Sequence, residues 1–164
     1  MTTTTHRAWV YGDNVNTDVI FPGKYTYTVR EPEQIARHAL EDLDADFASN
    51  VQSGDVIVAG RNWGCGSSRE QAVTALKYCG VRVIIAQAFS GLYFRNCINQ
   101  GIHPILCPPD FNKSIKTGDT VLIDYAKGVI SANGETFNIP PLSPTVRHIL
   151  SAGGLVAMLK ARSG

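Results

Sequence analysis

The residues best suited to carry out chemistry lie in one glycine-rich stretch, residues 60–70, which reads Gly-Arg-Asn-Trp-Gly-Cys-Gly-Ser-Ser-Arg-Glu. An apolar run at residues 55–59 precedes it, and an alanine-rich helical pattern at residues 70–79 follows it. Where a strand breaks into glycines and then opens a helix, backbone N–H groups and a helix N-terminus converge on an anion. The stretch therefore predicts a site for a carboxylate or an alkoxide.

Three side chains in this stretch can act on such an anion. Arg69 can contact a carboxylate through two parallel hydrogen bonds. Serine is normally too weak an acid to serve as a base, but aimed N–H donors and a guanidinium would stabilise Ser67 as an alkoxide. The simpler interpretation is a tight strand-to-helix turn in which Ser67 or Ser68 only caps the helix. It does not explain why Gly64, Gly66, two serines and an arginine occur within six residues.

Other kinds of active site fit the stretch less well. A dinucleotide-binding fingerprint that uses Gly64 and Gly66 needs a third glycine where Arg69 stands, and an acidic residue where the next strand ends at Gln87. A phosphate-binding loop needs Gly-Lys-Ser/Thr, which does not follow. A hydrolytic triad needs a histidine partner for the serine, and the stretch contains none. The following histidines are expected in structural, capping or surface positions: His38, His103 and His148.

The composition narrows the class of protein. With 164 residues, of which 44% are hydrophobic and 18% charged, the chain fits one domain with one buried core. A net charge of +1 provides no electrostatic basis for binding nucleic acid or a membrane surface. No apolar run approaches the length of a transmembrane helix, and the first residues lack the pattern of a secretory signal.

The four cysteines, at positions 65, 79, 97 and 107, include no Cys-x-x-Cys pair. This spacing is poor for zinc or for an iron–sulfur cluster held by this chain alone. Dispersed cysteines are typical of reduced thiols in a cytoplasmic protein. We therefore expect a cytoplasmic chain that binds no metal or cofactor by itself.

The pattern of elements predicts an α/β fold. Strand, helix, strand, helix and strand alternate across residues 55–107, which indicates a parallel or mixed sheet with right-handed crossovers. A first strand is expected at residues 7–11, and apolar residues at helical spacing predict one helix over residues 31–47. Short strands separated by turn signals are expected over residues 120–139. The expected fold is a single domain, residues 1–164, with a mixed, mainly parallel central sheet, flanking helices and C-terminal β-hairpins.

The chain resembles the small subunits of 3-isopropylmalate dehydratase and their relatives, the small subunits of homoaconitase and 2,3-dimethylmalate dehydratase. The resemblance covers nearly the whole chain and is carried by residues 12–18, 21–25, 58–70 and 93–101. The glycine–serine–arginine block is highly specific to the aconitase superfamily, where it lies on the fourth, mobile domain. The resemblance thus implies a swivelling β/β/α domain.

The resemblance also implies half of a heteromeric hydro-lyase, which isomerises 2-isopropylmalate and 3-isopropylmalate by dehydration and rehydration in leucine biosynthesis. A separate large subunit would carry a [4Fe-4S] cluster whose unligated iron takes the substrate hydroxyl, in a heterodimer or a heterotetramer. By the family's pattern, Ser67 is the base that removes a proton next to a carboxylate, and Arg69 binds a carboxylate and keeps Ser67 anionic. Substrate binding is assisted by Gly64, Cys65, Gly66 and Ser68.

In this family a second loop reads the substrate, here Tyr25, Thr26, Tyr27 and Thr28. In homoaconitase-type small subunits the loop reads Tyr-Leu-Arg-Thr, and its arginine meets the distal carboxylate of the substrate. Isopropylmalate types carry an apolar residue at that third position. Tyr27 stands there in this chain, which argues against a tricarboxylic substrate because an unpaired buried carboxylate is costly. Arg30, three residues on, could replace the missing arginine. A second departure from the family pattern is Gln71, where relatives usually carry histidine.

Several alternatives remain open from the sequence. Dimethylmalate or a homoaconitase substrate could replace isopropylmalate. The alternative from another class is a non-catalytic, anion-binding module that docks on a partner. A self-sufficient nucleotide-binding enzyme would bind NAD or ATP, and we expect neither.

Overall fold

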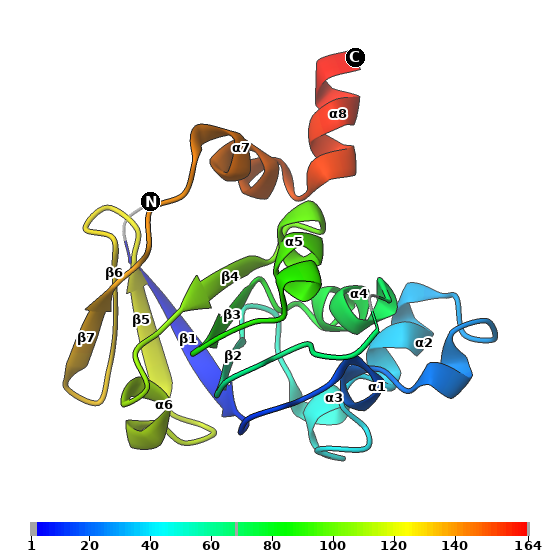
Figure 1. Cartoon of the computed structure of the whole chain (residues 1–164), viewed down its shortest axis with the longest axis horizontal. Helices are drawn as coiled ribbons and strands as arrows, with labels where there is room; N and C mark the ends of the chain where they lie inside the picture. Colours follow the sequence, from blue (N-terminus) through cyan, green and yellow to red (C-terminus); the bar gives the residue numbers. More distant parts are fainter. Residues whose placement is uncertain (1–2, 68, 164) are drawn as a thin grey trace.

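The computed structural model of the chain describes residues 3–67 and 69–163 and contains one seven-stranded sheet, in the order β4-β3-β2-β1-β5-β6-β7 (Figure 1). The strands are β1 (Thr3–Val10), β2 (Val56–Ala59), β3 (Val83–Ala86), β4 (His103–Leu106), β5 (Thr120–Asp124), β6 (Val129–Ala132) and β7 (Glu135–Asn138). Strands β1 to β4 pair in parallel, and β5 to β7 continue from β1 as an antiparallel meander. The expected α/β fold with a mixed sheet is confirmed, and the C-terminal hairpins extend the sheet instead of packing beside it.

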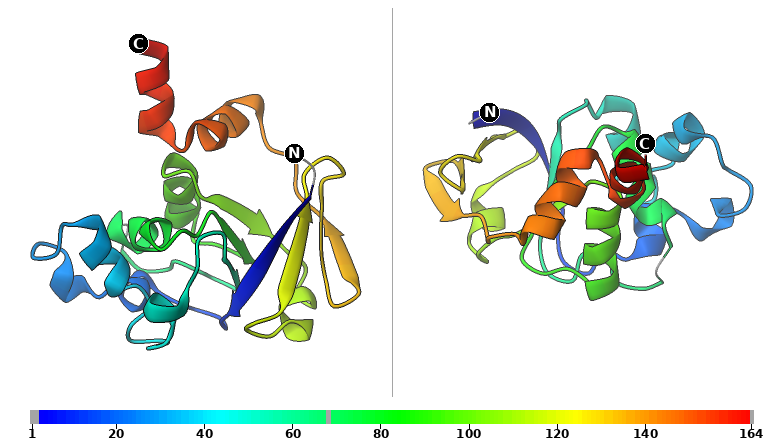
Figure 2. Two further views of the ribbon diagram at one scale, coloured as in Figure 1. Left: turned by 180° about the vertical axis from the view of Figure 1, so that it is seen from behind. Right: turned by 90° about the horizontal axis from the view of Figure 1, so that it is seen from above.

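The helices lie mainly around the parallel half of the sheet (Figures 1 and 2). They are α1 (Thr17–Ile20), α2 (Pro32–Arg37), α3 (Phe47–Asn50), α4 (Gln71–Tyr78), α5 (Gly91–Asn99), α6 (Phe111–Ser114), α7 (Pro144–Ala152) and α8 (Leu155–Ser163), with a 3-10 turn η1 (Gly23–Tyr25). Helix α8 projects from the body beyond α5 and α7 (Figure 1). In the part of the chain that the structure describes, no helix is both long and apolar enough to span a membrane.

The core lies on both faces of the parallel strands, which explains their continuous apolar sequences. One face, with Ile57 and Ile84, packs against the apolar residues of α2, α4 and α5. The other face, with Val56 and Val58, packs in one cluster with Val121 and other residues of β5 and β6. Because these residues of β2, β5 and β6 belong to the same sheet, the sheet must curl to bring them together.

The prediction of a single helix over residues 31–47 is wrong. Helix α2 ends at Arg37, Leu40 has a φ of +57°, and the chain turns until α3 begins at Phe47. The intervening run contains three aspartates, which have low helix propensity because their side chains compete for backbone groups. One of them, Asp44, accepts hydrogen bonds from the backbone N–H of Asp46 and from the hydroxyl of Tyr11, which directly follows β1. Leu40 and Phe47 are nevertheless fully buried as the apolar spacing predicted, whereas Leu43, expected on the same face, is 42% exposed.

Asp55 joins the first two parallel strands at the amino end of β2, the end opposite the glycine-rich stretch. This carboxylate is 4% exposed, and its Oδ2 atom accepts hydrogen bonds from the Arg7 guanidinium at 2.8 Å, the Trp9 indole N–H at 2.9 Å and the Gln52 backbone N–H at 2.9 Å. Burial alone would raise the pKa of Asp55, but the hydrogen bonds from Gln52, Trp9 and Arg7 outweigh it and hold the pKa below its ordinary value.

Replacing Asp55 by asparagine is expected to lower the free energy of unfolding by about 1–3 kcal/mol at neutral pH, because charge-assisted hydrogen bonds are lost. The folded-state pKa lies below the unfolded value of about 3.8, so this stabilisation is fully present above the unfolded value and is lost as the pH falls through the lower, folded-state pKa. Urea unfolding at neutral pH and at a pH well below the unfolded value should therefore show a difference between wild type and Asp55→Asn that narrows in acid. The exposed Asp42→Asn is the control, and an equal loss in both variants would contradict the prediction.

Candidate active site

The candidate site is built by two segments that run side by side beyond the ends of β1 and β2. Residues 12–18 follow β1 and residues 60–66 follow β2, and they remain hydrogen-bonded after the strands end. The backbone N–H of Asn14 donates to Arg61 O at 2.8 Å, and the N–H of Thr17 donates to Cys65 O at 2.8 Å. The carboxyl ends of neighbouring parallel strands are where α/β proteins commonly place their sites.

Two glycines allow this loop to fit between α1 and α5. Gly64 has a φ of +81°, and a Cβ atom there would lie 2.2 Å from the ring of Tyr93 on α5. Gly66 has a φ of +102°, and a Cβ there would lie 3.2 Å from Thr17 Oγ1 on α1. Both positions therefore require glycine. The close packing fixes where the chain emerges, immediately before Ser67.

Ser67 lies exposed at the end of the loop, within reach of two polar side chains. Its Oγ atom is 3.4 Å from Thr17 Oγ1 and 3.4 Å from Arg69 Nε. The helix that follows begins with Glu70 in the capping position, and no side-chain hydrogen bond caps it. Ser67 is thus not a helix cap, so its hydroxyl is free for another role. Ser68, the second predicted hydroxyl, lies outside the described residues.

Arg69 is held by α1 and by the turn after it. Its Nη2 atom donates to Asp18 Oδ1 at 2.8 Å and to Phe21 O at 3.1 Å, and its Nη1 atom donates to Thr26 Oγ1 at 3.1 Å. With the contact from Nε to Ser67, four hydrogen bonds use the guanidinium, which has five N–H donors. The Arg69 side chain is 18% exposed, so its charge is shielded from solvent and directed at the serine.

The structure brings one member of the predicted specificity loop to the site. Thr26 contacts Arg69 through its hydroxyl, and its carbonyl accepts a hydrogen bond from Gln71 Nε2 at 3.1 Å. Tyr25 instead stacks on the ring of His38, with ring centroids 3.9 Å apart, and its hydroxyl donates to a glutamate after α2. Tyr27 is 82% exposed. Gln71, which replaces the usual histidine, therefore ties the start of α4 to this loop.

The sequence interpretation assigned no role to Thr17 and Asp18. They contact Ser67 and Arg69, although about 50 residues separate the partners in the chain. The sequence does contain a signal for Thr17 and Asp18. They belong to a polar run that follows the first strand, and the carboxyl ends of neighbouring parallel strands meet at one edge of a sheet. Applying that rule to β1 and β2 would have placed Asp18 near the glycine loop.

The space around Ser67 is not a complete pocket. A crevice lined by Gly64, Ser67, Arg69, Tyr93 and Asn96 has a free volume of about 0 Å³. Pockets for small ligands typically have about 300–1,000 Å³. The described residues around Ser67 therefore do not enclose a space that could hold a substrate.

The cysteines give no indication of a metal centre. Each of the four is a free thiol, and burial raises the pKa of Cys79 and of Cys107 to about 12. Metal coordination requires thiolates, which such values disfavour. Across residues 3–67 and 69–163, no three His, Cys, Asp or Glu side chains form a group that could hold a metal ion.

Comparison with known proteins places the chain in a family. Residues 11–110 match the family of the aconitase C-terminal domain. The 3-isopropylmalate dehydratase small subunit 1 of Archaeoglobus fulgidus is 45% identical, covering 94% of this chain and 96% of that protein. The methanogen homoaconitase small subunit of Methanocaldococcus jannaschii is 47% identical, covering 95% of this chain and 91% of that protein.

A solved structure agrees with these relatives. The crystal structure of 3-isopropylmalate dehydratase from Methanocaldococcus jannaschii superposes with a TM-score of 0.89 at 44% identity, covering 98% of this chain and 95% of that one. The blocks that carried the resemblance in the sequence, including the whole glycine–serine–arginine stretch, lie within the residues that match the family, 11–110. The chain belongs to the aconitase C-terminal domain family.

Proposed function

We propose that this chain is the small subunit of a hydro-lyase with 3-isopropylmalate dehydratase activity, working as one swivelling domain in the cytoplasm. The observation that carries the proposal is the exposed Ser67 hydroxyl, held beside an arginine that is itself fixed by Asp18 and Thr26. The names of the relatives at 40–47% identity support the choice of reaction.

In this reaction Ser67 Oγ takes a proton from the substrate carbon next to a carboxylate. A serine can do so only as an alkoxide, and the nearest stabilising charge is the Arg69 guanidinium, whose Nε faces the oxygen. Arg69 also binds a substrate carboxylate. Because four of its hydrogen bonds are already made, a two-point contact through Nη1 requires Arg69 to release the Thr26 hydroxyl, now at 3.1 Å, while Nε stays on Ser67.

The proposal divides the active site between two chains. We infer that a large subunit holds a [4Fe-4S] cluster, which supplies the Lewis acid for the substrate hydroxyl. The raised thiol pKa values in this chain fit that division, and so does the lack of free volume at Ser67, because a second surface is needed to enclose the substrate. Free thiols also suit a reducing cytoplasm.

Reconstitution with a cluster-bearing large subunit tests the proposal. The complex is expected to convert 3-isopropylmalate with transient ultraviolet absorbance from the unsaturated acid, and neither chain alone should do so. A complex that assembles but produces no unsaturated acid from isopropylmalate, dimethylmalate or homocitrate would show that the chain is a non-catalytic module.

Homoaconitase activity is the second candidate, since one relative at 47% identity is named for it. Arg30 is exposed three residues after Tyr27 and provides a cation for a distal carboxylate. Turnover of homocitrate by the wild-type complex, with a selective loss in Arg30→Gln, would favour this candidate over isopropylmalate.

Replacing Tyr27 by arginine is expected to shift substrate preference toward a tricarboxylate. An arginine at this exposed position would pair with a distal carboxylate, and a charge-assisted hydrogen bond corresponds to roughly a tenfold to hundredfold gain in relative kcat/KM for homocitrate over isopropylmalate. Tyr78→Arg, at another exposed tyrosine on α4, is the matched control. If Tyr27→Arg leaves the preference untouched, this loop does not read the substrate.

A further inference from the structure

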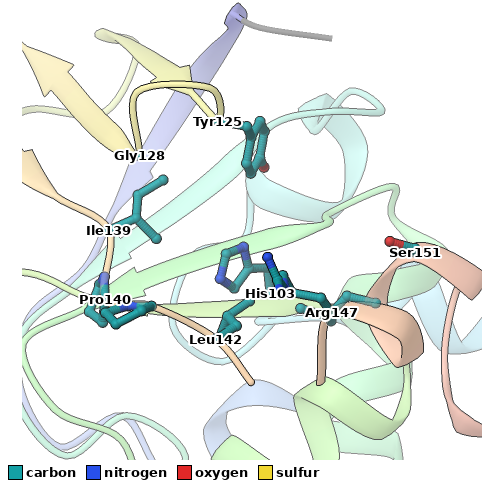
Figure 3. Close-up of a pocket in the computed structure, with 10 residues that line it drawn as sticks. His103, Tyr125, Gly128, Ile139, Pro140, Leu142, Arg147 and Ser151 are labelled. Atoms are coloured by element: carbon teal, nitrogen blue, oxygen red, sulfur yellow. The ribbon is translucent and has the colours of Figure 1, made fainter. Parts of the chain in front are cut away.

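A second cavity lies at the opposite edge of the parallel strands from Ser67. His103, which lines it, begins β4, whereas Ser67 follows the carboxyl end of β2. The cavity is open to solvent and is lined by the turn between β5 and β6, by residues 139–142 that link β7 to α7, and by α7 itself (Figure 3). Its volume of about 380 Å³ falls within the range of small-molecule sites.

The walls of this cavity are largely apolar. Ile139, Pro140 and Leu142 come from the linking segment, and Leu150 comes from α7. Such surfaces favour the hydrocarbon part of a ligand, because its burial removes apolar area from water.

Four polar side chains line the cavity beside these apolar walls, and none of them is acidic: His103, Tyr125, Arg147 and Ser151. Arg147 extends from α7 toward His103, and the ring of Tyr125 lies on the other side of the cavity (Figure 3). Within the described part of the chain, the Arg147 guanidinium makes neither an ion pair nor a hydrogen bond. Burial lowers the pKa of His103 to about 4 and raises the pKa of Tyr125. At neutral pH the cavity therefore offers one cation, Arg147, and three neutral hydrogen-bonding groups, on His103, Tyr125 and Ser151.

We propose that this cavity binds a small aliphatic carboxylate, with its carboxylate on Arg147 and its hydrocarbon chain against Ile139 and Leu142. Charge complementarity selects the anion, since no acidic residue among those described lines the cavity. The apolar walls select a hydrocarbon body over a simple inorganic anion. The site uses no residue of the Ser67 loop, so it is independent of the proposed function.

Nuclear magnetic resonance titration of the full chain with hexanoate tests this site. The amide signals of Gly128, Arg147 and Leu150 should shift on saturation, whereas acetate and hexanol should bind much more weakly because each lacks one half of the ligand. Arg147→Gln should weaken hexanoate binding by roughly tenfold or more. Arg147 is exposed, so this variant is expected to fold. Arg162→Gln on the exposed side of α8 removes the same charge elsewhere and should leave the affinity unchanged.

Three results would overturn the proposal. Equal binding of hexanol and hexanoate would show an apolar crevice without recognition of an anion. Unchanged affinity in Arg147→Gln would remove the arginine as the anchor. If hexanoate shifts none of these signals while the large subunit shifts all of them, the cavity is part of a protein interface.

Discussion

Replacing Ser67 by alanine is expected to lower kcat of the reconstituted complex by about 10²- to 10⁴-fold, the usual contribution of a positioned base. The side chain is exposed, and its contacts with Thr17 and Arg69 are both long, at 3.4 Å. Losing them should cost little stability, so the variant should still fold and assemble with the large subunit. The measurement is kcat for 3-isopropylmalate, together with the affinity between subunits.

The control for this experiment is Ser49→Ala. Ser49 is also exposed and makes only local hydrogen bonds, to Asp46 O at 3.5 Å and from Asn50 Nδ2 at 3.3 Å, and it lies on α3. The kcat of the complex that contains Ser49→Ala should equal that of the wild-type complex. Wild-type turnover in Ser67→Ala would remove this serine as the base and would leave the adjacent Ser68 as the hydroxyl to test.

Replacing Arg69 by glutamine is expected to lower kcat/KM by about 10²- to 10³-fold, comparable with the loss of a donor that stabilises charge in a transition state. The substitution removes both the cation beside Ser67 and the group proposed to bind a carboxylate of the substrate. Arg69→Lys should recover little of this loss, because an ammonium cannot contact Ser67, Asp18 and Thr26 together.

This loss should be one of activity and not of folding. The Asp18 side chain is 71% exposed, so it remains hydrated when its partner is removed, and an exposed ion pair contributes little stability. The matched control is Arg61→Gln, since Arg61 lies on the same loop and pairs with Asp13 at 3.3 Å. A large drop in the melting temperature of Arg69→Gln, or an equal loss of activity in Arg61→Gln, would contradict the assignment.

The sequence was sufficient to locate the reactive stretch, because the signal there is local. The signal consists of a strand, two glycines separated by one residue, and a helix, all within about 25 consecutive residues. The structure contains that strand and that helix close to the expected bounds. The family resemblance, confirmed by comparison, rests on the same block. The catalytic roles of Ser67 and Arg69 stay predictions until activity is measured.

The surroundings of the stretch were harder to predict because they depend on contacts between distant segments. Thr17 and Asp18 reach the site only through the parallel pairing of β1 with β2. Tyr25 was expected to contact substrate, yet its ring stacks on His38, whose position follows from the break after α2. That break depends on tertiary contacts of Asp44, which no local periodicity encodes.

The absence of free volume at Ser67 has a kinetic consequence. If the substrate is enclosed only while the two chains are bound to each other, the fraction of active enzyme depends on their concentrations and on the dissociation constant of the complex. Diluting an equimolar mixture below the dissociation constant of the complex should then make specific activity fall with concentration, and an excess of either chain should restore it. In that case the abundance of either chain would set the flux through the reaction.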